Sequence, residues 1–170
     1  MKTYLWGALT RYGVAAALVT ALLDQASKLW LLYVYDLGPR GRVPVLPFFD
    51  LVLVWNKGIS YGLFQMNGLM GQIALTGFKV VAAIALFVWL MRAKGRVLAL
   101  GLGLIIGGAL GNAIDRLLYG AVADFALLHA QIGGQRYDWY IFNLADVAIV
   151  AGVIGLLYDM ALGHSAAKAP

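Results

Sequence analysis

The stretch that decides the fold is GGALGNAIDRLLYGAVADF, residues Gly107 to Phe125. It begins apolar and rich in glycine, and three strongly polar side chains then follow, at Asn112, Asp115 and Arg116. Asp115 follows Asn112 by three residues and Arg116 follows it by four, so a helix places both on the same face as Asn112. Ionisable side chains in an apolar span are costly, so they usually face a bundle interior or a wet cavity and mark function. We therefore expect the rest of the chain to supply partners for this face.

The composition is typical of a membrane protein. Of the 170 residues, 62% are hydrophobic and only 12% are charged, with a mean hydropathy of +0.82, which is outside the range of soluble domains. This length favours a single domain, residues 1–170. All eight acidic residues are Asp, so any carboxylate chemistry must come from aspartates. With no Cys and only two His, we expect no metal and no cofactor.

The positive charge of the chain indicates which partner it meets. Its net charge is +5 and its pI is near 9.6, values that would also suit a nucleic-acid-binding protein. The basic residues, however, lie at the ends of apolar segments. Anionic membrane lipids are therefore the expected partner, and nucleic acid is not.

Four apolar segments are predicted to cross the membrane as helices: residues 11–33, 69–91, 97–118 and 141–162. Residues 1–23 begin like a secretory signal, but Arg11 interrupts them. The apolar run continues to about residue 33 with no small-residue cleavage site, which favours a retained helix. The basic turn RAKGR, Arg92–Arg96, is the strongest orientation signal. The positive-inside rule places this turn in the cytoplasm, and with four spans both termini are then cytoplasmic. Lys79, near the middle of the second segment, has no evident partner in the sequence.

Residues 36–68 are not a membrane span. Glycines and prolines punctuate this segment, and DLVLVWN, Asp50–Asn56, is predicted to form a short strand. Aromatic residues are abundant, as expected at a membrane–water boundary. Two interpretations stay open: an ordinary extracytoplasmic loop, and a platform that receives something at the membrane surface.

The polar residues of three predicted helices share one depth. Counted from the basic residue or histidine at the cytoplasmic end of each span, Lys28, Asn112 and Asp146 lie roughly 24–27 Å along helices that rise about 1.5 Å per residue, in hydrocarbon roughly 30 Å thick. Asp124 lies beyond the third helix, where we expect a loop to fold back to the same level. We therefore predict one polar layer near the outer face.

Asp124 and Asp146 are the candidate catalytic pair in this layer. Two carboxylates held close together cannot both ionise easily, so they share a proton. One can then activate water while the other protonates a carbonyl or a leaving group. Spacing alone leaves two other roles open for them, structural hydrogen bonding and a proton relay.

The remaining charged residues of this layer have predicted roles as well. Asp24 and Lys28 are four residues apart with the acid first, which favours an ion pair on one helix. That pair could tie helices together or contact a substrate directly. We predict that Asp115 is structural and holds Arg116 in place through hydrogen bonds.

Five short motifs together resemble a known family. They are D-Q-x-S-K at Asp24–Lys28, N-x-G at Asn56–Gly58, G-N-x-x-D-R at Gly111–Arg116, V-x-D-F at Val122–Phe125 and F-N-x-A-D at Phe142–Asp146. Each is weak alone, but in this order on four spans the chain resembles the lipoprotein signal peptidases, or signal peptidase II, of bacteria. The resemblance covers nearly the whole chain. Tyr61 departs from it, since Phe is more familiar at that position.

The resemblance implies a fold and an activity. The fold would be mainly α and polytopic, with four transmembrane helices, a small extracytoplasmic β-cradle within residues 36–68, and a short amphipathic helix near Tyr61–Gly68. The activity would be that of an intramembrane aspartyl protease that removes signal peptides from diacylglyceryl-modified prolipoproteins, cutting on the N-terminal side of the lipidated cysteine. It would act as a monomer in the cytoplasmic (inner) membrane, with its active site near the outer face.

The resemblance also implies roles for residues. Asp124 and Asp146 would be the catalytic dyad. The residues that support the dyad or the substrate would be Asn112, Asp115, Arg116 and Asn143. Those that shape the site would be Asp24, Lys28, Asn56 and Gly58.

Two other activities stay open on the residues alone. A small proton-coupled transporter would also carry Asp, Asn and Arg inside a bundle, although transport sites usually lie near the membrane midplane rather than near one face. A serine–lysine signal peptidase could use Ser60 with Lys57 or Lys28.

Overall fold

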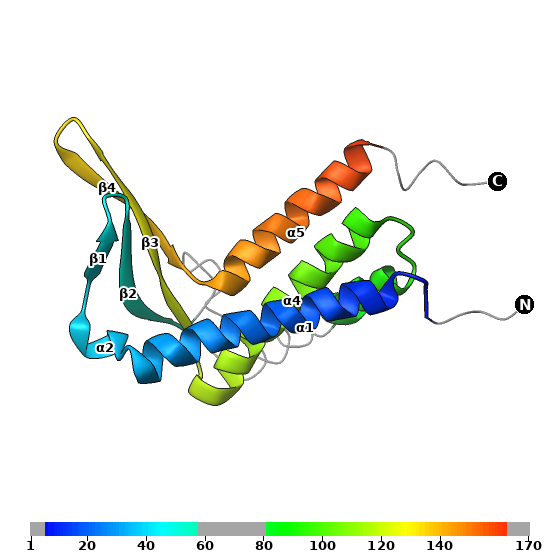
Figure 1. Ribbon diagram of the computed structural model, residues 1–170, viewed down its shortest axis with the longest axis horizontal. Coiled ribbons are helices and arrows are strands. Elements are labelled where there is room, and N and C mark those ends of the chain that lie inside the picture. Colours follow the sequence, from blue (N-terminus) through cyan, green and yellow to red (C-terminus); the bar gives the residue numbers. More distant parts are fainter. Residues whose placement is uncertain (1–5, 58–80, 163–170) are drawn as a thin grey trace, which may run out of the picture.

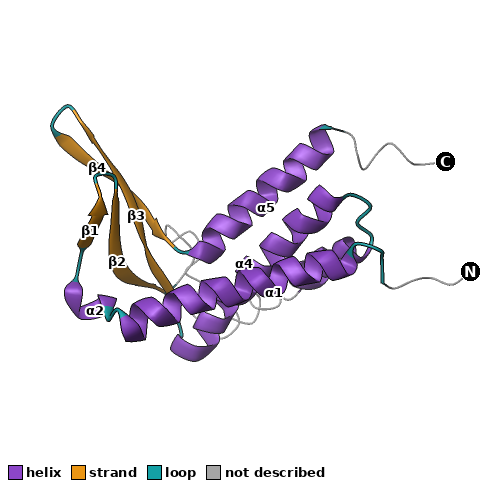
Figure 2. Cartoon of the chain, viewed as in Figure 1, coloured by secondary structure: helices purple, strands orange, loops and turns teal. Residues whose placement is uncertain are grey.

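The computed structural model describes residues 6–57 and 81–162, and it is mainly helical with one small sheet at the end of the helix bundle (Figures 1 and 2). Within this part of the chain, three helices are long and apolar enough to cross a membrane. They are α1 (Thr10–Leu29) with its π-helical continuation η1 (Trp30–Val34), α4 (Arg96–Tyr119) and α5 (Leu144–Ala161). A shorter apolar helix, Val81–Met91, belongs to the second predicted span, whose residues 69–80 lie outside the described ranges.

The sheet has four antiparallel strands in the order β1-β2-β3-β4. The strands are β1 (Val43–Leu46), β2 (Phe49–Asn56), β3 (Val122–Ile132) and β4 (Gln135–Phe142), and the short helix α2 (Leu37–Arg40) precedes them. The strand predicted over residues 50–56 is β2. The amphipathic helix predicted near residues 61–68 lies outside the described residues.

The second half of the sheet corrects two expectations. Asp124 lies in β3 rather than in a loop that folds back, because the chain enters an extended strand two residues after Gly120 ends α4. The turn between β3 and β4 is Gly133–Gly134, and both residues have positive φ angles, 59° and 79°, which glycine tolerates. The last helix begins at Leu144 instead of near residue 141, because the preceding residues still pair in β4.

Helix α4 lies between α1 and α5 and packs closely on both. The glycines on its α1 side recur every four residues, at Gly103, Gly107 and Gly111. A Cβ added to Gly107 would lie 2.7 Å from Cβ of Thr20, and a Cβ added to Gly108, on the α5 side, would lie 2.8 Å from Cγ1 of Ile149. Small residues let helices approach closely in a membrane, so these glycines allow α4 to pack tightly on both neighbouring helices.

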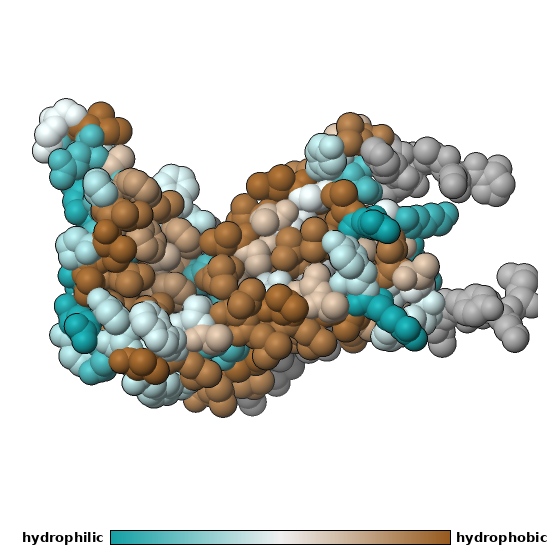
Figure 3. Space-filling view, viewed as in Figure 1, coloured by the Kyte–Doolittle hydropathy of each residue, from teal (hydrophilic) through white to brown (hydrophobic). Residues whose placement is uncertain are grey.

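Figure 1 shows that α1 begins, α4 begins and α5 ends at the end of the bundle opposite the sheet. A small buried core at that end holds Leu90, Ala93, Leu98, Ala99 and Leu102. The sheet projects away from α5, so the two form a V, and apolar side chains cover much of the helix surface in the space-filling view (Figure 3). The outer surface of the helices thus suits lipid, while the sheet stands at one end of the bundle.

An ion cluster that the sequence did not indicate joins the strands of the sheet. The buried carboxylate of Asp50 on β2 accepts hydrogen bonds from Arg42 Nε at 2.6 Å and from Arg136 Nη2 at 2.5 Å, and His129 Nε2 lies 3.2 Å from it. Both arginines also bind Asp138, at 2.9 and 2.7 Å. Although burial opposes ionisation, these hydrogen bonds hold the pKa of Asp50 at about 2. The cluster therefore links β2, β3 and β4 to the residue that precedes β1.

Candidate active site

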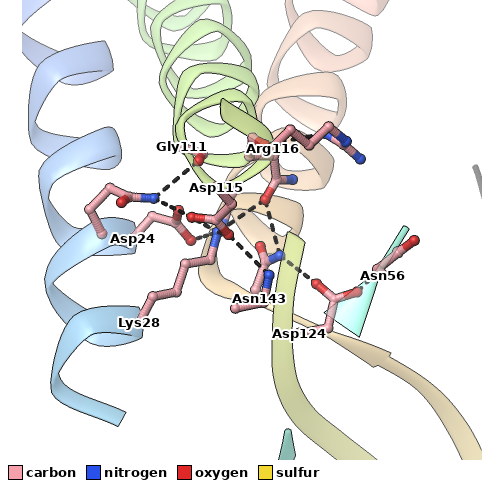
Figure 4. A network of polar contacts seen from close by, with 12 residues as sticks. Asp24, Lys28, Asn56, Gly111, Asp115, Arg116, Asp124 and Asn143 are labelled. Atoms are coloured by element: carbon pink, nitrogen blue, oxygen red, sulfur yellow. Dashed lines mark hydrogen bonds and ion pairs between the residues drawn. The ribbon is translucent and has the colours of Figure 1, made fainter. Parts of the chain in front are cut away.

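Polar side chains from α1, α4, α5, β2 and β3 meet where the helix bundle joins the sheet (Figure 4). Lys28 Nζ lies 3.1 Å from Oδ1 of Asn112, and Nδ2 of Asn112 lies 3.0 Å from Oδ1 of Asp146. Three residues from three helices are therefore in contact, as the common depth predicted.

Lys28 lies near the end of α1 and is only 2% exposed. It is the central residue on the α1 side of the site. Its ammonium lies 2.7 Å from Oδ2 of Asp24 and 2.8 Å from Oδ2 of Asp115. The other oxygen of Asp24 accepts a hydrogen bond of 2.9 Å from the backbone N–H of Ala145, in the first turn of α5. The Asp24–Lys28 pair therefore joins α1 to both α4 and α5, which supports the structural interpretation of this pair.

The same contacts bear on the serine–lysine alternative. An ammonium has three N–H donors and no acceptor, and Lys28 has three oxygen partners within 3.1 Å. Because these three oxygen atoms hold the ε-amino group of Lys28, it is not free to take a proton from a serine hydroxyl. Lys57 is exposed, and Ser60 lies outside the described residues, as do Gly58 and Lys79.

Asp115 does not hold Arg116, contrary to our prediction. Its carboxylate, fully buried, accepts hydrogen bonds from Gln25 Nε2 at 2.7 Å and from the backbone N–H of Ala123 at 3.1 Å. Arg116 instead donates from Nη1 to the backbone carbonyl of Asn112 at 3.3 Å. The reason is geometric, because consecutive residues of a helix point in different directions. Gln25, which belongs to the D-Q-x-S-K motif but was given no predicted role, is therefore also a neighbour of the site.

Asp124 lies at the start of β3, is 4% exposed and is held by two asparagines. Asn56 on β2 donates to Oδ2 at 3.0 Å, and Asn143 donates to Oδ1 at 2.6 Å. Burial raises the pKa of Asp124, and the negative charge of Asp146 raises it further, while the two amide hydrogen bonds oppose the rise. Asp124 therefore keeps its proton to a higher pH than an exposed aspartate does.

Asp146 is held at the first turn of α5. Its Oδ1 accepts from Nδ2 of Asn112, and its Oδ2 accepts from the backbone N–H of Asn143 at 3.1 Å. In return, the side-chain oxygen of Asn143 accepts from the backbone N–H of Asp146 at 3.0 Å, which completes a capping box.

Asp124 and Asp146 line one cleft of about 640 Å³. The other lining residues are Asn56, Tyr140, Ile141, Ile149 and Val150. The cleft thus combines two carboxyl groups with apolar walls contributed by β4 and α5. Such a pair can exchange protons with a water molecule and with an amide bond that lies between them.

The comparison with known protein families is decisive. Residues 16–162 match the family model described as signal peptidase (SPase) II. The chain belongs to the signal peptidase II family. Family membership makes it a protease of the membrane and leaves no support for the transporter alternative.

Relatives in the signal peptidase II family are similar over nearly their full length. The lipoprotein signal peptidase of Rhodopseudomonas palustris is 62% identical over 160 residues, which cover 94% of this chain and 98% of that relative. The lipoprotein signal peptidase of Nitrobacter hamburgensis is 59% identical, with the same coverage. A solved bacterial membrane enzyme superposes with a TM-score of 0.72 at 27% identity, covering 94% of this chain and 93% of that one.

Proposed function

We propose that this chain is an aspartyl endopeptidase that removes signal peptides from diacylglyceryl-modified prolipoproteins, cleaving on the N-terminal side of the lipidated cysteine. Membership of the signal peptidase II family supports the reaction, and its relatives are named lipoprotein signal peptidases. One observation carries the assignment of the chemistry to Asp124 and Asp146. They are two aspartates from different elements, a strand and a helix start, and they line the same cleft.

The proposed mechanism uses Asp124 and Asp146 as an acid–base pair. The two carboxyl groups share one proton, so one member is ionised and the other is protonated. The ionised member takes a proton from a water molecule as its oxygen attacks the scissile carbonyl carbon. The protonated member donates to the carbonyl oxygen, and a proton then passes to the leaving amine as the C–N bond breaks. As the amine leaves with the proton that came from water, a hydroxyl of the tetrahedral intermediate returns its proton to the ionised member, so the pair again holds a single proton.

The surroundings suit a lipid-anchored substrate. The pair lies at the sheet end of the bundle, and the walls of the cleft from Ile149 and Val150 are apolar. A substrate whose acyl chains stay in the outer leaflet presents its scissile bond near the headgroup level, where water is also available. We therefore place this end of the bundle at the outer face of the bacterial inner membrane, with the opposite end in the cytoplasm.

The test is cleavage by the purified enzyme. Wild-type protein in detergent or lipid should convert a diacylglyceryl-modified prolipoprotein to a shorter form, seen as a gel shift. The same precursor without the diacylglyceryl group should stay uncleaved, and Ser60→Ala should cleave as the wild type does. Equal cleavage of both precursors would contradict the proposed substrate, and loss of activity in Ser60→Ala would favour serine chemistry.

A further inference from the structure

The two side-chain amides between the aspartates have fixed orientations. An asparagine amide carries an oxygen that accepts and a nitrogen that donates, and its chemical partners decide which end faces which neighbour. Asn143, only 1% exposed, must present its oxygen to the backbone N–H of Asp146, so its nitrogen faces Asp124. Nδ2 of Asn143 also donates to Oδ1 of Asn112, at 3.1 Å.

The orientation of Asn112 depends on Lys28. The ammonium of Lys28 can only donate, so the side chain of Asn112 must turn its oxygen toward it, at 3.1 Å. The nitrogen of Asn112 then faces Asp146, at 3.0 Å. In the reverse orientation, the Asn112 nitrogen would oppose the donors of Lys28 and Asn143, and its oxygen would oppose a carboxylate oxygen of Asp146. The ammonium of Lys28 thus helps to determine which end of the Asn112 amide faces Asp146.

We propose that Lys28 is a positioning residue for the aspartate pair, acting through Asn112, whose amide it holds with the donor end toward Asp146. This inference rests on the proposed role of Asp124 and Asp146 as the catalytic pair. Lys28 does not touch the cleft, which is lined by other residues. Its contribution is therefore orientation and charge, not proton transfer.

The charge of Lys28 gives this role a signature in the pH profile. The charged groups that face Lys28 are Asp24 on its own helix and Asp115 on α4, and its positive charge also lowers the pKa of Asp124. A neutral residue at position 28 removes this effect, so the pKa of Asp124 rises. The pair then keeps its second proton to a higher pH, and the acidic limb of the rate profile moves to higher pH.

The experiment compares Lys28→Gln with Lys28→Arg in the intact enzyme, with lipidated prolipoprotein as substrate. Gln can present its own carbonyl to Asn112, so its amide no longer holds Asn112 in one orientation. We expect kcat to fall about 10–100-fold, the range typical of residues that orient functional ligands, and the pH profile to shift as described. Arg only donates and stays charged, so Lys28→Arg should keep the wild-type pH profile.

A double-mutant cycle separates this role from a structural one. If Lys28 acts through Asn112, Lys28→Gln should cost little more kcat in an Asn112→Leu background, whereas independent roles would give additive losses. Gly103→Ala, which crowds the same α1–α4 interface, is the control for lost stability and should lower the Tm without moving the pH profile.

Two outcomes would overturn the proposal: a folded Lys28→Gln enzyme with wild-type kcat and pH profile, or additive losses in the cycle. If Lys28→Gln does not fold, Lys28→Arg decides, since a shifted profile in that variant would contradict the role. Asp124→Asn, assayed in parallel, distinguishes a failure of the proposed catalytic pair from a failure of the proposed role of Lys28. An active Asp124→Asn enzyme would reject the catalytic pair itself, whereas an inactive one alongside a wild-type-like Lys28→Gln would reject only the role of Lys28.

Discussion

At the scale of single residues, Asn143 connects the two aspartates more directly than any other described side chain. Its backbone N–H and side-chain oxygen both bond Asp146, and its side-chain nitrogen bonds Asp124 at 2.6 Å. One residue therefore caps α5 and holds a strand residue from the sheet. Its two tasks can be separated by substitution.

Asn143→Ala should remove both the cap of α5 and the hydrogen bond to Asp124, whereas Asn143→Ser should remove only the hydrogen bond to Asp124. Ala loses the cap, which should lower the free energy of unfolding by about 1 kcal/mol, and it also removes the donor to Asp124. The hydroxyl of Ser can still accept from the N–H of Asp146, so Ser should restore the Tm. It is too short to donate to Asp124, so cleavage should stay low in both variants. Thermal unfolding and the gel-shift assay measure the two effects, and full activity in Asn143→Ser would contradict the second task.

The sequence could predict part of this residue's role. The three-residue spacing of Asn143 and Asp146 is that of a helix cap, and both residues belong to the F-N-x-A-D motif. The bond to Asp124 could not be predicted, because it depends on β3, where the sequence suggested a loop. The partners of Asp115 were mispredicted for a related reason, since adjacency in sequence suggested Arg116 while the helix turned it away.

At the scale of elements, the long helices were the easier part to predict. The predicted span 97–118 lies one residue inside each end of α4, because basic residues precede it, Gly120 follows it and most of the residues between them are apolar. The strands β3 and β4 were harder. β3 begins with a nearly continuous buried run, Val122–Leu127, that shows no alternation of apolar and polar residues. Such a run cannot be assigned to strand or helix by periodicity alone.

Helix packing makes a prediction about glycines. Gly107→Ala should destabilise the protein by about 1–3 kcal/mol, as expected of an overpacked contact, because the new methyl group would press on the backbone of α1 at Ala17 and on Thr20. Gly155→Ala is the matched control. Its added methyl group would meet its nearest neighbours at 3.7–4.0 Å, an ordinary contact, so the Tm should not fall. Equal Tm values for both variants would show that α4 does not need glycine at position 107.

The ion cluster of the sheet predicts a pH dependence of stability. The pKa of Asp50 is held at about 2, below its ordinary value of 3.8, so ionised Asp50 stabilises the folded state. That contribution should be fully present above about pH 4 and should vanish as the pH falls through about 2. The difference in Tm between the wild type and Asp50→Asn should follow this course. A difference that stayed constant from pH 6 to pH 2 would show that the charge of Asp50 is not what stabilises the sheet.

At the scale of the whole molecule, counting helical rise was enough to predict that Lys28, Asn112 and Asp146 meet. Residues on long apolar helices share a depth when they are equally far from the charged ends, so one dimension of the site could be read from the sequence. The contacts made by the sheet could not be predicted by counting helical rise. The pairing of β2 with β3 brings Asn56 to Asp124, and such long-range register is not encoded in local sequence patterns.

The orientation of the molecule makes a prediction about topology. Reporter fusions after Lys94, beside the start of α4, should report the cytoplasm because of the basic turn. Fusions after Gly134, in the β3–β4 turn, should report the extracytoplasmic side. The opposite pattern would place the aspartate pair at the cytoplasmic face and would contradict the proposed approach of the substrate.

The central claim is that Asp124 and Asp146 act as one catalytic unit, and the most direct test is cleavage of a diacylglyceryl-modified prolipoprotein by Asp124→Asn, Asp146→Asn and the double variant. Asn keeps the shape of Asp but cannot accept and return a proton, so each single variant should lose about 10²–10⁴-fold in rate. Because the two share one role, the double variant should be no slower than either single one. Substrate binding by each folded variant should persist. Cleavage at a near-normal rate by a well-folded Asp124→Asn or Asp146→Asn enzyme would contradict the claim.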